Sequence, residues 1–208
     1  MLTAACNQDN KQLKLNPSSV SYIESTKENK KSYKSILLAA KELKKQIITS
    51  DSFEMLYGRF IVDSIIPYWY GTRWNFYGTT EVPKTGTIAC GYFVTTILRD
   101  ADINISRIKM AQAPSEEMIN TVCHKESMKR FRNTTMQTFI NELYQLENGL
   151  HIIGLDFHTG FIYHENEKLV FIHSSYQTPQ MVIQQNVHES AILAASKYKV
   201  IGKVNLRK

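Results

Sequence analysis

A cysteine at the start of an apolar helical run is the residue with the clearest chemical potential. Cys90 follows a loop marked by Pro83 and Gly86 and begins a run whose apolar positions share one helical face. A thiol is a strong nucleophile only as the thiolate, which the positive end of a helix dipole favours. Backbone amides there would also stabilise an oxyanion, and Gly91 would allow close approach. The alternative is a small buried cysteine that only fills the core.

Two histidines downstream could activate this thiol. His158 and His173 are 15 positions apart, on two consecutive apolar segments. An even hairpin loop, such as a two-residue turn at Glu165 and Asn166, would place them directly opposite each other with Cβ atoms about 5 Å apart. We therefore predict that His158 accepts the proton of Cys90 and that His173 fixes the tautomer and ring position of His158. Taken singly, each histidine is more often structural.

The densest aromatic cluster lies just upstream of the cysteine, at residues 68–78. Its proline and glycine neighbours predict an irregular loop or strand. Two interpretations stay open: core packing around turns, or the wall of a substrate groove that includes Trp74 and Tyr77. Within the cluster, Arg73 is a candidate for holding a substrate carboxylate, although a surface arginine is the plainer interpretation.

The order of these residues resembles the NlpC-type cell-wall cysteine peptidases, a papain-like superfamily. The resemblance covers residues 74–175. It rests on Cys90 at a helix start, on His158 followed by Gly160 on a strand, and on His173 in an Ile-His-Ser context on the next strand.

The resemblance implies a role for each of these positions. It makes Cys90 the nucleophile, His158 the base and His173 a polar orienter, with Tyr77 or Trp74 as the upstream aromatic residue that lines the oxyanion site. It also implies a papain-like fold, with the nucleophile at the start of a helix packed on the sheet. Members of the family cut amide bonds in peptidoglycan stem peptides, which implies peptidoglycan or a peptide as the substrate.

The chain departs from the family pattern in three places. Ala89-Cys90-Gly91-Tyr92 stands where the family commonly has Asp-Cys-Ser-Gly, and the upstream Gly-Gly element is reduced to Tyr77-Gly78. The interval between the cysteine and the first histidine is lengthened by an insertion that includes residues 135–146. These departures keep the hydrolase chemistry but loosen the link to one particular substrate.

The composition narrows the classes of protein further. The chain has 208 residues, is 43% hydrophobic and carries a net charge of +6, with much of the lysine in the first 45 residues. It shows no Arg-rich helix, zinc-finger spacing or stacking motif, so nucleic-acid binding is not expected. The three cysteines, Cys6, Cys90 and Cys123, fit neither a disulfide framework nor a metal site, and no metal or cofactor is predicted. The oligomeric state is left open.

The first residues resemble the end of a bacterial lipoprotein signal. In Leu2-Thr3-Ala4-Ala5-Cys6 small residues precede a cysteine, although the basic and apolar parts of such a signal are missing. If Met1 lies inside a longer reading frame, Cys6 is a lipidation candidate and the protein is expected in the cell envelope, as a periplasmic or outer-membrane lipoprotein. Otherwise Cys6 is an ordinary thiol and a cytoplasmic protein is expected. No segment reaches the roughly 20 apolar residues that span a bilayer.

The elements that must position these residues follow from periodicity. Residues 1–30 are polar and predict a tail or linker, and residues 31–208 predict a single domain. We expect helices at residues 32–48, 52–66, 90–100, from 115, at 135–146 and at 189–196, with a strand or loop at 103–110. We expect strands at residues 150–157, 160–163, 169–173, 181–183 and 199–204. Helices followed by an antiparallel sheet predict an α+β fold.

Three functions fit these observations. The first is a cysteine peptidase or amidase that cuts amide bonds, with peptidoglycan stem peptides as its expected substrate. The alternative is a non-catalytic envelope lipoprotein that binds a cell-wall or peptide ligand in a degenerate papain-like groove. A weaker third option is a cysteine-dependent transferase.

Overall fold

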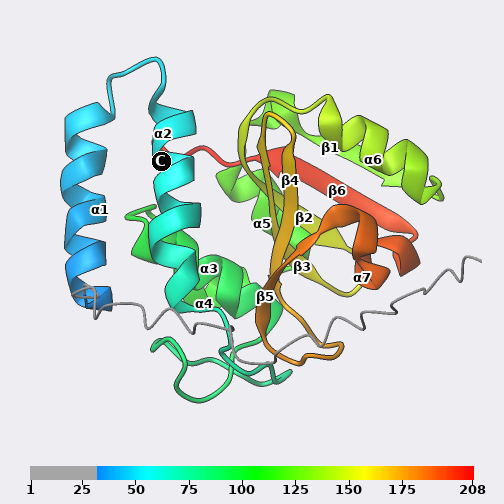
Figure 1. Cartoon of the computed structure of the whole chain (residues 1–208), viewed down its shortest axis with the longest axis horizontal. Helices are drawn as coiled ribbons and strands as arrows, with labels where there is room; N and C mark the ends of the chain where they lie inside the picture. The colour runs from blue at the N-terminus through cyan, green and yellow to red at the C-terminus, as the bar shows by residue number, and fades with distance from the viewer. Residues whose placement is uncertain (1–31) are drawn as a thin grey trace, which may run out of the picture. The chain divides into compact units, whose positions relative to one another are not determined.

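A six-stranded antiparallel sheet forms the centre of the computed structural model, which describes residues 32–208 (Figure 1). The strand order is β1-β6-β2-β3-β4-β5, and all neighbouring strands are antiparallel. The strands are β1 Lys129–Arg132, β2 Gly149–Leu155, β3 Thr159–Glu165, β4 Lys168–Ser174, β5 Val182–Asn186 and β6 Tyr198–Lys203. Lys31–Lys208 form one compact unit. The predicted α+β class is confirmed, whereas Cys6 and the predicted tail lie outside the described residues.

Seven α-helices accompany the sheet within this part of the chain. They are α1 Tyr33–Ile47, α2 Phe53–Phe60, α3 Cys90–Asp100, α4 Arg107–Ala111, α5 Ser115–Val122, α6 Met136–Tyr144 and α7 Ala191–Ala195. After α2 the chain continues through a π-helical turn, Ile61–Ile65, and a 3₁₀ turn, Ile66–Tyr68. The helices expected from apolar periodicity are therefore present.

Two short elements differ from the prediction. The segment 103–110, expected as a strand or loop, turns into helix α4 at Arg107. Strand β1 was not predicted at all, since its sequence Lys-Arg-Phe-Arg is charged and only Phe131 is buried. That composition suits an edge strand, which β1 is.

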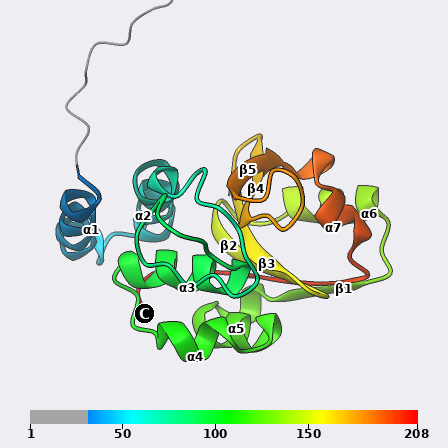
Figure 2. The same ribbon diagram turned by 90° about the horizontal axis from the view of Figure 1, so that it is seen from below.

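Alternate residues of the central strands face two separate cores. Ile152 and Phe161 belong to the core that includes α3, whereas Ile153 and Ile162 belong to the core formed with α6 and α7. In Figure 2, α3, α4 and α5 accordingly lie on one side of the sheet, and α6 and α7 lie on the other. Helices α3 and α7 are thus on opposite faces of the sheet.

Helix α3 is held in place by fully buried side chains. Phe93, Val94, Ile97 and Leu98 have no solvent exposure, and burial of each contributes roughly 1.5–3 kcal/mol. The ring of Phe93 packs edge-on against Phe161 of β3, with centroids 6.0 Å apart. The first residue of this helix is therefore fixed relative to the start of β3.

A tight turn joins β2 to β3. The amide of Leu155 donates to the carbonyl of His158 at 2.8 Å, so only Asp156 and Phe157 form the turn. The strand predicted to reach residue 157 therefore ends at Leu155. His158 lies just before β3, at the end of the sheet.

Within the described residues, no helix combines the length and apolar character needed to cross a membrane.

Candidate active site

Cys90 is the first residue of α3, as the sequence predicted. The preceding Ala89 is extended and supplies no side-chain cap. The first amides of a helix have no acceptor within the helix, so they remain available to an anion. Hydrogen bonds from Ile88 to the carbonyl of Arg73 and from Ala89 to that of Gly78 tie this helix start to the aromatic loop.

The thiol of Cys90 lies against the segment that carries the first histidine. Burial raises the pKa of Cys90 above its usual value, while the backbone amides of Thr159, Gly91 and Cys90 itself lower it in part. Thr159, whose amide lowers the pKa of Cys90, is the first residue of β3 and lines the same hollow as Cys90, so the start of β3 lies beside the thiol. With its pKa raised, the thiol is protonated at neutral pH and needs a base before it can attack.

His158 and His173 do form the predicted pair. The Nε2 atom of His158 is 2.8 Å from Nδ1 of His173, and the two rings are nearly perpendicular at 86°. His173 is fully buried and stacks on Phe171, with centroids 4.0 Å apart. The second ring therefore has one fixed orientation.

The predicted register of this pair was wrong. Glu165 pairs with Lys168, so the loop consists of Asn166 and Glu167 and the two histidines are not directly opposite each other. A Cβ atom added to Gly160 would lie only 2.8 Å from Cβ of His173, so the position facing His173 is Gly160. Because that position has no side chain, the ring of His158 reaches His173 diagonally.

Burial keeps both imidazoles neutral. It lowers the pKa of His158 to about 3 and that of His173 to about 2, and His158 lowers the latter further. The Nδ1 atom of His158 is buried and has no hydrogen-bond partner among the described residues. His158 thus has its Nε2 atom in contact with His173 and its Nδ1 atom without a partner among the described residues.

Two residues that sequence reasoning missed extend this pair. Gln185 of β5 places its amide Nε2 atom 2.9 Å from Nε2 of His173 and 2.9 Å from Oγ of Ser190. Ser190 also caps α7 by accepting from the amide of Leu193. The two glutamines in Val-Ile-Gln-Gln-Asn alternate across β5, but this pattern could not show which one faces His173.

Cys90 and His158 line two hollows together. The larger, of about 510 Å³, is walled by aromatic side chains: Trp74, Phe76, Tyr77, Tyr92, Phe157 and Tyr176. The smaller, of about 210 Å³, is lined on its other sides by residues of α4, α5 and the β2–β3 turn. We call the larger hollow the aromatic trough. Trp74 and Tyr77 both line it, so the groove-wall interpretation fits their positions.

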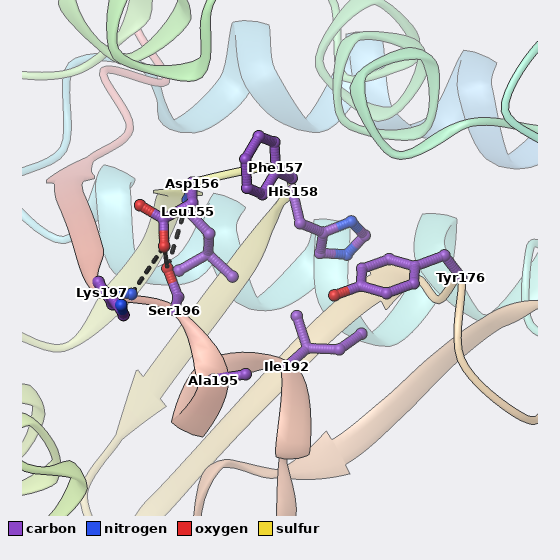
Figure 3. Close-up of a pocket in the computed structure, with 9 residues that line it drawn as sticks. All are labelled: Leu155, Asp156, Phe157, His158, Tyr176, Ile192, Ala195, Ser196 and Lys197. Carbon is purple, nitrogen blue, oxygen red and sulfur yellow. Dashed lines mark hydrogen bonds between the residues drawn. The ribbon is translucent and has the colours of Figure 1, made fainter.

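A third hollow, of about 480 Å³, lies on the α7 side of His158 (Figure 3). The rings of His158 and Tyr176 meet edge to face here, with centroids 5.3 Å apart, near Ile192. Asp156 accepts hydrogen bonds from Ser196 and from the backbone of Lys197 at the far end. His158 therefore contributes to all three hollows.

Tyr176 and Phe157 were not predicted as site residues. Tyr176 lines both the aromatic trough and the hollow on the α7 side. Phe157 is 95% exposed at the tip of the β2–β3 turn and borders all three hollows. The only sequence signal for Phe157 was its place next to His158.

The two remaining predicted site residues have simpler environments. Arg73 is exposed, its backbone bridges Thr87 and Met181, and it lines none of the three hollows. Gly91 lines the aromatic trough, but a Cβ atom there would lie 2.5 Å from the carbonyl oxygen of Ala111. Close packing on α4 therefore already requires glycine.

The side chains that could bind a metal ion do not cluster in the described part of the chain. Within residues 32–208, no group of three or more histidine, cysteine or acidic side chains is placed to hold a metal ion. Cys123 is buried, and its thiol donates to the carbonyl of Gly202 at 3.2 Å.

No family model, curated protein or solved structure matches the chain.

Proposed function

We propose that this protein is a cysteine hydrolase that cuts amide bonds, with Cys90 as nucleophile and His158 as base. The observation that carries the proposal is the position of His158. It shares two hollows with Cys90, and its Nε2 atom is held 2.8 Å from His173. A nucleophile, a base and an orienter in this order form the arrangement used for acyl transfer on several unrelated folds.

The chemistry follows from these positions. The Cys90 sulfur attacks the carbonyl carbon while its proton passes to Nδ1 of His158, and the charge on the carbonyl oxygen is stabilised by amides at the start of α3. His158 then gives the proton to the leaving nitrogen as the carbon–nitrogen bond breaks, which leaves a thioester. Water attacks the thioester and His158 accepts a proton from that water. When the carbon–sulfur bond breaks, His158 gives this proton to the sulfur, which restores the thiol.

The lining of the site supports a substrate with two different ends. No lysine, arginine, aspartate or glutamate lines the aromatic trough, so the part of the substrate bound there is uncharged. Lys197 and Asp156 both line the hollow on the α7 side, where a charged part of a peptide can bind. A stem peptide of peptidoglycan, with an amide between unlike residues, is the substrate class we propose.

The resemblance to NlpC-type peptidases supports the same proposal. The order Cys90, His158, His173 and a helix start packed on an antiparallel sheet are what a papain-like fold of that type requires. An envelope location through a lipid on Cys6 belongs to this proposal and depends on residues outside the described part.

Product analysis tests the hydrolase directly. The full chain is incubated with purified peptidoglycan fragments and with peptide amides, and the products are identified by mass spectrometry. We expect cleavage at one type of amide bond, its complete loss in Cys90→Ala and its retention in the matched variant Cys123→Ala. Cleavage that persists in Cys90→Ala would contradict the proposal. Added amine acceptors distinguish hydrolysis from transfer.

Two observations favour a second candidate, a protein that binds a ligand in this groove without cleaving it. The pKa of Cys90 is raised, and Nδ1 of His158 makes no hydrogen bond among residues 32–208. Such a protein would bind peptidoglycan fragments equally well with cysteine or alanine at position 90. It would release no product in either form. Isothermal titration together with product analysis separates the two functions.

A further inference from the structure

A line of four polar side chains crosses the face of the sheet opposite α3. His158 contacts His173 at 2.8 Å, His173 contacts Gln185 at 2.9 Å, and Gln185 contacts Ser190 at 2.9 Å. His173 has no solvent exposure, and Ser190 has 2%. Both ring nitrogens of the buried His173 therefore contact members of the line.

Each neutral imidazole in the line carries one proton, on one of its two nitrogens. If His173 accepts from Gln185 at Nε2, its proton is on Nδ1 and is donated to Nε2 of His158. The proton of His158 is then on Nδ1, which can no longer accept one. If His173 instead donates from Nε2, every proton moves to the other nitrogen, and Nδ1 of His158 is free to accept.

The amide of Gln185 selects between these two orders. In the structure its nitrogen faces His173, which sets the order in which His158 cannot act as a base. That order buries an N–H of His158 without an acceptor among the described residues. A half-turn of the amide places its oxygen toward His173. The contact with Ser190 survives, because the hydroxyl can donate to that oxygen while it still accepts from Leu193.

We propose that Gln185 is a positioning residue whose amide orientation sets the proton order of His173 and His158, and so decides whether His158 can accept the proton of Cys90. This inference rests on the proposed cysteine chemistry. Gln185 touches neither the thiol nor the substrate and acts only through His173. Ser190 supports the active orientation by donating to the amide oxygen.

The chain offers three informative variants. Gln185→Glu presents only acceptor atoms to His173 and fixes the active order. Gln185→Met keeps the length of the side chain but removes both hydrogen-bonding groups. Gln184→Met is the matched control, because Gln184 is the exposed neighbour on β5 and bonds Tyr70 instead, at 3.0 Å.

The experiment measures histidine tautomers by nitrogen NMR on the full chain labelled with ¹⁵N-histidine, at pH 8, where both rings are neutral. In parallel, the rate at which iodoacetamide alkylates Cys90 is followed by intact mass. We expect Gln185→Glu to show His158 protonated at Nε2 and to alkylate at least about 10-fold faster than the native protein, whose amide orientation sets the order in which His158 cannot act as a base. We expect Gln185→Met to show mixed tautomers and to alkylate at a rate between those of the native protein and Gln185→Glu, because neither proton order is then selected. Gln184→Met should match the native protein.

Unchanged tautomers and an unchanged alkylation rate in Gln185→Met would overturn the inference. So would a His158 ring in Gln185→Glu that keeps its proton on Nδ1. If the tautomers respond to Gln185 as expected but the native protein cleaves no amide, the positioning role stands and the proposed hydrolase fails. The two proposals are thus tested separately.

Discussion

The two cysteines of the described chain sit at opposite ends of helices and have opposite surroundings. Cys90 begins α3, lines two hollows and lies beside the amides of Thr159 and Gly91. Cys123 follows the last residue of α5 and donates its proton to the carbonyl of Gly202. Amides at a helix start favour a thiolate, and a carbonyl favours the thiol. The helix end and the access to solvent, rather than the residue type, therefore decide what each thiol can do.

The largest expected difference between the two sites is in thiol reactivity. Burial raises the pKa of Cys123 from 9.0 to about 12, which lowers its thiolate population by about 10³-fold at a given pH. We expect iodoacetamide to modify Cys90 in the native protein at least about 100-fold faster than Cys123. Peptide mapping after timed labelling measures both rates. Equal rates would remove the distinction between the two cysteines.

Replacement of the proposed base, His158, should have an effect of comparable size. His158→Asn keeps a polar side chain of similar size but cannot take up a proton, so we expect amide cleavage to fall about 10²–10⁴-fold. The variant should leave the labelling of Cys123 unchanged, because Cys123 has no contact with this histidine. Steady-state kinetics and labelling on the same preparation provide both measurements. A His158→Asn enzyme that cleaves at the native rate would exclude His158 as the base.

The free energy of unfolding should respond more strongly to replacement of Cys123 than to replacement of Cys90. Cys123→Ala removes a buried sulfur and its hydrogen bond, and we expect a loss of about 1–2 kcal/mol in the free energy of unfolding. Cys90→Ala changes a residue that is only half-buried, and we expect a change of less than about 0.5 kcal/mol. Urea denaturation monitored by tryptophan fluorescence tests both. A larger loss for Cys90→Ala would identify Cys90 as core packing.

Acid should lower the free energy of unfolding through the buried pair of His158 and His173. The folded protein holds His158 and His173 neutral down to about pH 3 and 2, whereas in the unfolded chain they take up protons below about 6.5. The unfolded state thus binds more protons, so stability is complete above pH 6.5 and is lost as the pH falls. Between pH 6 and 5 each histidine should contribute a loss of about 1 kcal/mol. His158→Asn/His173→Asn should flatten that slope in urea titrations, and an unchanged slope would contradict the buried neutral state.

Local patterns were enough to predict the elements that carry the site. The helix that starts at Cys90 was predicted because its apolar residues repeat at helical spacing behind a loop, and that pattern does not depend on the rest of the fold. The strand that carries His173 followed in the same way from a short apolar run. The contact between His158 and His173 was predicted correctly, although the register proposed for it was not.

The β2–β3 turn, the register of β3 against β4 and the contact of Gln185 with His173 were not predicted, because local sequence patterns do not determine them. The β2–β3 turn at Asp156 and Phe157 has neither glycine nor proline, so nothing marked it. The position of the β3–β4 loop sets the register of β3 against β4, which changes the residue facing His173 from His158 to Gly160. Gln185 meets His173 only because β5 pairs with β4 in one particular register, in which Ile183 is the residue directly across from His173.

The placement of α3 and the polar line on opposite faces of the sheet has a mechanical consequence. Cys90 moves with the helical layer, while His173, Gln185 and Ser190 move with the sheet and α7. His158 joins them only because it stands at the strand end, where the two faces meet. A shear of one layer against the other by about 1 Å, too small to unfold either core, would separate the sulfur from its base. The distance between Cys90 and His158 therefore depends on the packing between the two layers, to which the contact of Phe93 with Phe161 contributes.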